Sequence, residues 1–280
     1  MTENASEIAK GQRFEFGKNW SEFLSVVDGH RIRRAEEALR NLLGTYEPLD
    51  RKFLDLGSGS GLMSLAARRL GMRVVSFDYD PSSVACTKAL KSQYSPDDEH
   101  WTVLEGSILD DDFVRSLGQY DVVYSWGVLH HTGAMWHAIE RAAGLVAVGG
   151  TLVIAIYNDQ GPWSRVWRTI KVIYNRIPSW LRKPFVVLVM VPCELRIAFV
   201  PIVKLKPMAY FSRWTREASE GNRGMSQWYD YVDWVGGYPF EVAKPEEVFT
   251  FCRGRGFSLE VLKTCAGDHG CNEFVFSQRS

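Results

Sequence analysis

A glycine-rich segment that follows a short apolar run constrains this chain more than any other feature. The segment reads Asp55-Leu-Gly57-Ser-Gly59-Ser-Gly61, and a helical pattern begins directly after it. Glycines at such a junction permit a tight turn, and they let a ligand approach the backbone beside a helix N-terminus. The segment therefore predicts a ligand-binding loop between a first strand and a first helix.

Strand-like and helix-like segments alternate from this loop onward. Seven apolar runs predict strands, at residues 52–56, 73–80, 100–107, 120–129, 149–158, 258–265 and 272–278. Helical patterns of roughly 10–15 residues separate the first five runs, an arrangement that predicts βαβ units and a parallel sheet. We therefore expect an α/β fold with a doubly wound, mostly parallel seven-stranded sheet.

The alternation divides the chain into three parts. It stops after Asn158 and resumes at a capped helix that begins at Lys244. The expected parts are an N-terminal helical cap at residues 1–50, an α/β domain at residues 51–159 and 244–280, and a lid inserted after the fifth strand at residues 160–243.

Composition and cysteine usage exclude several classes of protein. Thirty-three basic and thirty-three acidic residues cancel, so net charge predicts no anionic partner. Five scattered cysteines without a C-x-x-C pair argue against a disulfide framework and a zinc ribbon. Cys265 and Cys271 flank Asp268 and His269, but this spacing fits no standard metal site. We expect no metal and a cytoplasmic location, because the N-terminal segment has no apolar signal region.

An acidic residue at the end of the second predicted strand is a second signal of a ligand site, in addition to the glycine loop. A carboxylate at the position of Asp78 can accept both hydroxyls of a ribose, in dinucleotide enzymes and in other nucleoside-cofactor enzymes. Dinucleotide enzymes use G-x-G-x-x-G, which would place a third glycine where Leu62 stands. The third glycine comes one residue earlier, which disfavours a pyrophosphate ligand.

Three consecutive segments carry a family resemblance. FLDLGSGSG, VVSFDYDP and YDVVYSWGVLHHTGAM resemble the motifs of class I S-adenosylmethionine (SAM) methyltransferases. The VLHHT form is similar to small-molecule members such as the methylases of quinone biosynthesis. The resemblance covers about residues 52–158 and, by strand pattern, residues 244–280. It implies a Rossmann-like methyltransferase domain with SAM as its cofactor.

The resemblance also implies roles for single residues. Asp55 and the glycine loop would hold the amino-acid part of SAM, and Asp78 would hold the ribose beside Tyr79. Ser107 stands where many relatives have an aspartate that accepts from the adenine amine, which leaves the backbone of Ile108 to make that contact. The implied cofactor-binding residues are Asp55, Gly57, Ser58, Gly59, Gly61, Asp78, Tyr79, Ser107, Ile108, Ser125 and Trp126.

Methyl transfer also needs an aligned acceptor, exclusion of water and, for some acceptors, a base. His130 and His131 follow the fourth strand at the carboxyl edge, and a neutral imidazole is a suitable base. We expect His131 to be the first choice for the base that takes the acceptor's proton. Asp230 and Asp233 lie one helical turn apart in an aromatic stretch, 228–240, and are second choices. The same aromatic residues could instead form the core of a small lid.

The predicted insertion is strongly basic. Residues 160–223 hold twelve Lys or Arg and three acidic residues. In the helical pattern 163–176, the apolar stripe consists of Trp163, Trp167, Ile170 and Tyr174, and the basic residues largely outside it are Arg165, Arg168, Lys171 and Arg176. Such a helix can lie on an anionic membrane, bind nucleic acid or receive an anionic substrate, or can pack on the core with a solvated face.

Two observations limit these alternatives. The apolar run 185–191 is too short to span a membrane, which needs about 20 largely uncharged residues, so we expect a buried helix or strand or at most an interfacial segment. No DPPY or NPPY motif follows the fourth strand, which disfavours methylation of nucleic-acid bases. The preferred interpretation is a methyltransferase for a small molecule. The alternatives are a lipid-linked or membrane-proximal acceptor, a nucleic-acid methylase and a SAM-binding protein without catalysis.

Overall fold

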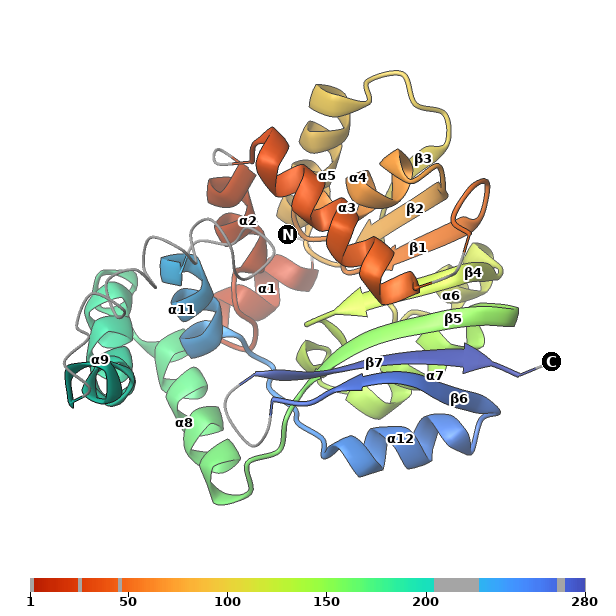
Figure 1. Cartoon of the computed structure of the whole chain (residues 1–280). Helices are drawn as coiled ribbons and strands as arrows, with labels where there is room; N and C mark the ends of the chain where they lie inside the picture. Colours follow the sequence, from red (N-terminus) through yellow and green to blue (C-terminus); the bar gives the residue numbers. More distant parts are fainter. Residues whose placement is uncertain (1–2, 25–26, 45–46, 204–226, 266–269, 280) are drawn as a thin grey trace.

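A seven-stranded sheet lies at the centre of the protein, shown as a computed structural model in Figure 1. Its strands are β1 (Lys52–Leu56), β2 (Arg73–Asp78), β3 (Trp101–Glu105), β4 (Tyr120–Trp126), β5 (Val146–Tyr157), β6 (Phe257–Lys263) and β7 (Cys271–Gln278). They lie in the order β3-β2-β1-β4-β5-β7-β6, and β7 runs antiparallel to both of its neighbours. The structure describes residues 3–24, 27–44, 47–203, 227–265 and 270–279.

Helices cover both faces of the sheet, which confirms the doubly wound α/β prediction. One face carries α3 (Gly29–Leu43), α4 (Leu62–Arg69) and α5 (Pro81–Tyr94), and the other carries α6 (Asp111–Leu117), α7 (Met135–Gly144) and α12 (Pro245–Arg253). Successive strand residues point to opposite faces, so Phe53 packs with α3 and α4 while Leu54 packs with α7.

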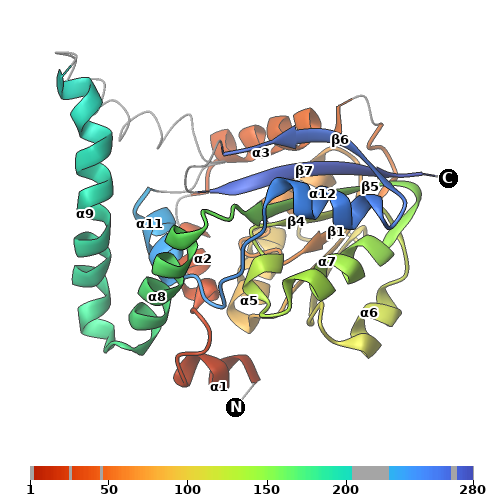
Figure 2. The same cartoon turned by 90° about the horizontal axis from the view of Figure 1, so that it is seen from below.

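A second group of helices lies beyond the carboxyl edge of the parallel strands (Figures 1 and 2). These are α1 (Glu3–Ala9), α2 (Phe16–Leu24), α8 (Pro162–Arg176), α9 (Ser179–Val203) and α11 (Gln227–Gly236). Phe14, Trp167, Tyr174, Val186 and Val235 form their shared apolar core. The N-terminal segment and the predicted insertion are thereby brought together over the edge at which the glycine loop lies.

Part of the predicted insertion falls outside the described residues. Residues 204–226 are not described, and they include the basic positions Lys204, Lys206, Arg213, Arg216 and Arg223. Asp268 and His269 lie outside the described residues as well. The function of residues 160–243 as a lid therefore stays a prediction.

Helix α8 buries Trp167 and Tyr174 of its predicted apolar stripe, but the buried face also takes in polar residues beside that stripe. Trp163, expected on the inner stripe, is 66% exposed, whereas Lys171 and Asn175 are buried. The physical reason is a set of hydrogen bonds to α11, in which Asn175 Nδ2 donates to the carbonyl of Gly236 at 2.7 Å and Lys171 Nζ donates to that of Trp234. Polar contacts with α11 thus accompany the apolar packing on the buried face of α8.

The apolar run 185–191 belongs to the long helix α9. Val186 on its inner side is buried, but Val187 and Leu188 are 49% and 71% exposed. The expectation of a buried segment is therefore wrong for the outer side of the helix. Among the helices formed by the described residues, none has the length and apolar character needed to cross a membrane.

Candidate functional site

The glycine loop joins β1 to α4 and is held against the end of β2. The backbone N–H groups of Gly57 and Ser58 donate to the carbonyl of Phe77 at 2.9 and 3.1 Å. Gly57 has a φ of +78°, and an added Cβ would lie 2.4 Å from the side chain of Val128. The loop at this point therefore requires glycine, and it forms a cradle of backbone at the sheet edge.

Asp78 ties this loop to the start of α5. Its Oδ2 accepts the N–H of Gly59 and its Oδ1 accepts the N–H of Asp80, each at 2.9 Å. Burial raises the pKa of the Asp78 carboxyl to about 6. Each carboxylate oxygen can accept a further hydrogen bond, so the group suits a ligand with two neighbouring hydroxyls.

Asp55 lies deeper, beneath the loop. It is 2% exposed and accepts the hydroxyl of Ser64, which is also hydrogen-bonded to Ser76 at 2.6 Å. The indole N–H of Trp101 donates to Ser76 at 2.7 Å and completes the network. Burial raises the pKa of Asp55 to about 7, and the nearby charge of Asp78 acts in the same direction. A cationic group of a ligand at this place would favour the ionised carboxylate.

The N-terminal segment covers the loop from outside. An added Cβ on Gly59 would lie 2.9 Å from the indole of Trp20, so this ring rests on the loop. Asp80 Oδ2 accepts the N–H of Gly17 at 2.8 Å, and its Oδ1 caps α5 through the N–H of Ser82. The guanidinium of Arg13 lies 4.7 Å from the centre of the Tyr79 ring.

Sequence reasoning assigned no site role to Arg13, Trp20 or Asp80. A signal existed for Asp80, because an aspartate directly before Pro81 is typical of a helix N-cap. No comparable signal links Trp20 to a loop about forty residues further along the chain.

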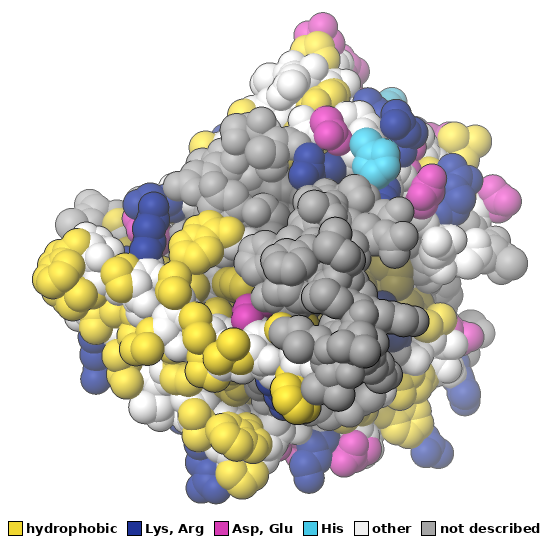
Figure 3. Space-filling model, turned by 60° about the vertical axis from the view of Figure 1, so that its left-hand side comes forward, with side chains coloured by type: hydrophobic (Ala, Val, Ile, Leu, Met, Phe, Trp, Pro, Cys, Tyr) yellow, Lys and Arg dark blue, Asp and Glu magenta, His cyan; other side chains and the backbone are white. Residues whose placement is uncertain are grey.

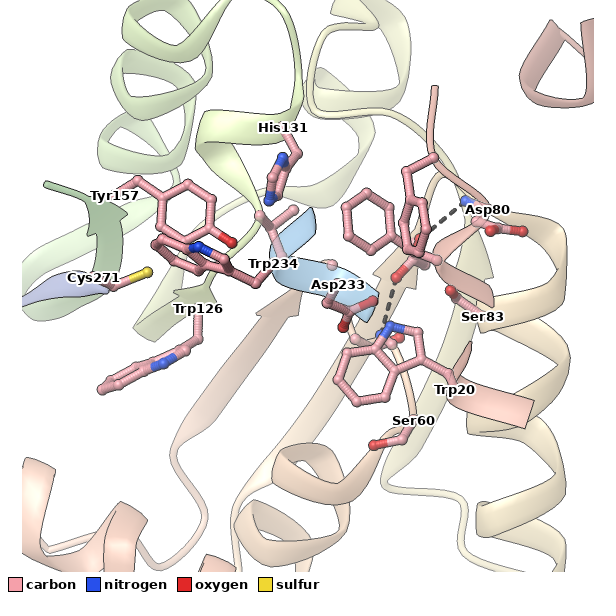
Figure 4. Close-up of a pocket in the computed structure, with 18 of the residues that line it drawn as sticks. Trp20, Ser60, Asp80, Ser83, Trp126, His131, Tyr157, Asp233, Trp234 and Cys271 are labelled. Atoms are coloured by element: carbon pink, nitrogen blue, oxygen red, sulfur yellow. Dashed lines mark hydrogen bonds between the residues drawn. The ribbon is translucent and has the colours of Figure 1, made fainter. Parts of the chain in front are cut away.

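A cavity of about 880 Å³ extends from the glycine loop to the helices beyond the sheet edge. Figure 4 shows Trp20, Ser60, Asp80 and Ser83 on one side of it and Trp126, Tyr157 and Cys271 on the other. The predicted cofactor residues that line it are Asp55, Gly57, Ser58, Gly59, Asp78, Tyr79, Ser107, Ile108 and Trp126.

Two predicted residues do not line the cavity. Gly61 precedes α4 and packs against Thr87, where an added Cβ would lie 2.9 Å from the threonine methyl group. Ser125 is fully buried and its hydroxyl donates to the carbonyl of Leu56 at 3.1 Å. Ser107 does line the cavity, but its Oγ accepts the N–H of Leu109 at 3.1 Å, so this side chain also stabilises the turn after β3.

Aromatic side chains and two carboxylates form the far side of the cavity. Asp230 and Asp233 line it from α11, as do Tyr231 and Trp234 of the same helix. Tyr157 lies at the end of β5, with its ring centre 4.9 Å from that of Trp234. The structure thus brings the second-choice carboxylates to the same cavity as the glycine loop.

The two histidines after β4 have different surroundings. His131 lines the cavity, and its Nδ1 lies 2.6 Å from the carbonyl of Pro239, which can only accept, so Nδ1 carries the proton. Burial lowers the pKa of His131 to about 3, and the positive charge of Lys171 acts in the same direction. The imidazole is therefore neutral at pH 7, with Nε2 as an acceptor.

His130 is fully buried and is not among the residues that line the cavity. Its Nδ1 accepts the backbone N–H of Tyr157 at 3.3 Å, and within the described residues its Nε2 has no hydrogen-bond partner. Burial lowers the pKa of His130 well below its ordinary value. Its position supports a structural contact at the end of β5 and gives it no direct access to the cavity.

Lys171 is a buried cation that the sequence pattern placed on the surface. Its Nζ lies 4.9 to 5.4 Å from the ring centres of Phe240, Trp234 and Tyr157. Burial lowers the pKa of this amine to about 7, while the charge of Asp233 opposes the shift. Two of the three rings line the cavity, so Lys171 supports that wall from behind.

Comparison with known proteins gives consistent results. A family model described as "Methyltransferase domain" matches residues 27–184. A ubiquinone biosynthesis O-methyltransferase of Escherichia coli O139:H28 is 31% identical over 113 residues, which are 40% of this chain and 45% of that protein. The chain thus matches less than half the length of this curated relative.

Two solved structures share the fold. Magnesium protoporphyrin IX methyltransferase from Synechocystis PCC 6803 with bound SAM aligns with a TM-score of 0.55 at 11% identity, over 99% of this chain and 98% of that one. An O-methyltransferase family protein from Burkholderia thailandensis aligns with a TM-score of 0.52 at 15% identity, over 89% of this chain and 57% of that one. At these identities the two alignments establish the fold.

We predict that Asp78→Ala weakens SAM binding. The change removes two hydrogen-bond acceptors and a charge, a loss of about 1.5–3 kcal/mol, which corresponds to roughly ten- to a hundredfold in affinity. Because the pKa of Asp78 is raised to about 6, SAM affinity of the wild type should also fall as the pH drops below that value. Calorimetric titration measures both effects. Asp112→Ala, at a highly exposed side chain, is the control, and unchanged affinity in Asp78→Ala would contradict the assignment.

We also predict that Lys171 makes stability depend on pH. Between about pH 7 and pH 10 the unfolded chain keeps the lysine proton that the folded chain releases, so the free energy of unfolding rises with pH across this window. Relative to Lys171→Met, the wild type should gain about 2–4 kcal/mol from pH 7 to pH 10 in urea unfolding. The exposed Lys88→Met is the control. A stability difference that does not change with pH would show that Lys171 is not buried in this way.

Proposed function

Because the chain belongs to the class I SAM-dependent methyltransferases, we propose that its methyl acceptor is a small, largely apolar molecule bound in the cavity beyond the glycine loop. The observation that carries this proposal is the continuity of one cavity from Asp78 to the aromatic wall at Trp234. Its volume of about 880 Å³ lies within the roughly 300–1,000 Å³ of small-molecule sites.

The residues of the loop side fit the cofactor. The glycine backbone, the Asp78 carboxylate and the buried Asp55 offer the contacts that an amino acid joined to a ribose requires. SAM supplies an electrophilic methyl group on a sulfonium. The protein's part is to hold this methyl group in line with the acceptor atom and to exclude water. Trp20 and the helices beyond the sheet edge supply that exclusion.

The aromatic wall indicates a planar acceptor. Trp126, Tyr157 and Trp234 present ring surfaces to the cavity, and such surfaces pack well against flat apolar molecules. The relatives named above are a ubiquinone biosynthesis O-methyltransferase and a magnesium protoporphyrin IX methyltransferase, names that agree with a planar acceptor. We therefore propose an oxygen atom on a ring-containing molecule as the methylated atom.

His131 would orient this acceptor. Its Nε2 can accept a hydrogen bond from an acceptor hydroxyl, because Nδ1 is engaged with Pro239. A pKa of about 3 makes the imidazole a weak base, so its proposed part is to orient the acceptor. Asp230 and Asp233, on the same cavity, are the groups proposed to take the proton.

Transfer of label from methyl-labelled SAM tests the proposed acceptor class. Phenols and catechols with an apolar ring substituent should become labelled, whereas tRNA, DNA and protein should not. Labelling of nucleic acid or protein without labelling of any small molecule would contradict the proposal.

We predict that His131→Asn lowers kcat/KM about tenfold to a hundredfold with such an acceptor. Asparagine can keep the donor to Pro239 but has no acceptor at the place of Nε2. SAM affinity should stay unchanged, and the exposed His137→Asn is the matched control. The rate of the wild type should show no ionisation of His131 between pH 5 and pH 9. A rate limb near pH 6.5 that disappears in His131→Asn would contradict the orienting role.

A further inference from the structure

Helices α8 and α9 expose an unusual number of large apolar side chains. We call this surface the α8–α9 face; its members are Trp163, Val166, Ile173, Trp180, Val187, Leu188, Val191, Leu195 and Phe199. Trp180 is 74% exposed, Leu188 71% and Leu195 66%. Figure 3 shows hydrophobic side chains gathered on the side of the molecule that carries these helices.

The exposed side chains of α9 follow the helical repeat. Trp180, Val187, Val191 and Leu195 recur at intervals of seven, four and four residues, and Leu188 adjoins Val187, which places all five on one outward stripe. The opposite side of the same helix packs inward, where Val186 joins the apolar core with α8 and α11. A helix that is apolar on both sides normally has a partner for each of them.

Charge indicates which partner fits the outward side. From Pro162 to Val203 the chain has seven basic residues and one acidic residue, Glu194. Five of them are exposed, namely Arg165, Arg168, Arg176, Lys183 and Arg196. Lys171 is buried, Arg182 is partly buried over the Tyr174 ring, and Arg196 also lines the cavity. Two copies of this face would bring like charges together. A surface that combines apolar groups with negative charge would attract the basic residues instead of repelling them. An anionic bilayer is such a surface.

The same helix forms part of the cavity. Met190, Cys193 and Ile197 of α9 line the cavity that contains the glycine loop, while Leu188 and Leu195 point to the exposed side. The α8–α9 face is therefore separated from the proposed acceptor site by the thickness of one helix. Contact of this face with another surface would place that surface directly beside the wall of the site.

We propose that the α8–α9 face docks on the surface of an anionic lipid bilayer. In this arrangement α9 lies along the membrane plane, its apolar stripe enters the region between headgroups and acyl chains, and the arginines contact the phosphates. The proposal does not depend on the nature of the methyl acceptor, because it concerns a surface outside the cavity.

Flotation with vesicles tests the docking. The full chain should float with vesicles of equal parts phosphatidylglycerol and phosphatidylcholine, and at least about tenfold less with phosphatidylcholine alone. The double variant Leu188→Gln, Leu195→Gln should lose about a hundredfold in binding to the mixed vesicles, since each leucine contributes about tenfold when buried. Arg165→Glu with Arg168→Glu should remove most of the preference for the anionic lipid.

Matched controls distinguish docking through this face from nonspecific binding by exposed apolar side chains. Leu49→Gln with Val148→Gln changes two apolar side chains that are equally exposed, 71% each, but lie away from α8 and α9. This control should float like the wild type, and thermal unfolding of each variant confirms that it is folded. The proposal is overturned if the wild type does not float, or if the leucine variant floats equally well. It is also overturned if the wild type forms a dimer that the leucine variant abolishes, because a second copy would then occupy the face.

Discussion

The carboxylate of Asp78 holds the site together because it accepts hydrogen bonds from two separate backbone segments. One oxygen fixes the glycine loop through Gly59, and the other fixes the start of α5 through Asp80. Asp80 in turn accepts the N–H of Gly17, so the cover formed by the N-terminal segment depends on the same corner of the sheet. A single buried carboxylate thus connects the loop, the second strand and the cap, at the cost of a raised pKa.

The far side of the cavity is formed by helices that pack through buried polar groups. Helix α8 packs on α11 through buried polar groups, Lys171 and Asn175, and turns Trp163 toward solvent. Burying these polar groups is tolerable because each finds a carbonyl acceptor, and the lysine also lies among aromatic rings. The consequence is a cavity wall of aromatic side chains and an outer face that keeps much of its apolar surface exposed. The proposed acceptor site and the proposed membrane contact are therefore located on opposite sides of α9.

The doubly wound, seven-stranded sheet could be predicted from the sequence because strand periodicity and glycine turns are local patterns. Alternation of Phe53 and Leu54 between two helical layers, and the glycines after β1, follow from periodicity and backbone sterics alone. Local patterns also predicted that the glycine loop and Asp78 would meet at one edge of the sheet, where both line the cavity. Helix periodicity predicted that Trp167 and Tyr174 of α8 face inward, but the burial of Lys171 and Asn175 depends on hydrogen bonds to α11, a partner about sixty residues away. The place of Lys171, the cover by Trp20 and the outward stripe of α9 all depend on such distant contacts.

In the proposed site, the cavity holds SAM at Asp78 and the acceptor at the aromatic wall. A crystal structure with S-adenosylhomocysteine tests it most directly. We predict that both ribose hydroxyls lie within hydrogen-bond distance of the Asp78 carboxylate and that the sulfur faces the part of the cavity between His131 and Trp234. A nucleoside bound with its ribose away from Asp78, or with the sulfur pointing away from that wall, would contradict the account.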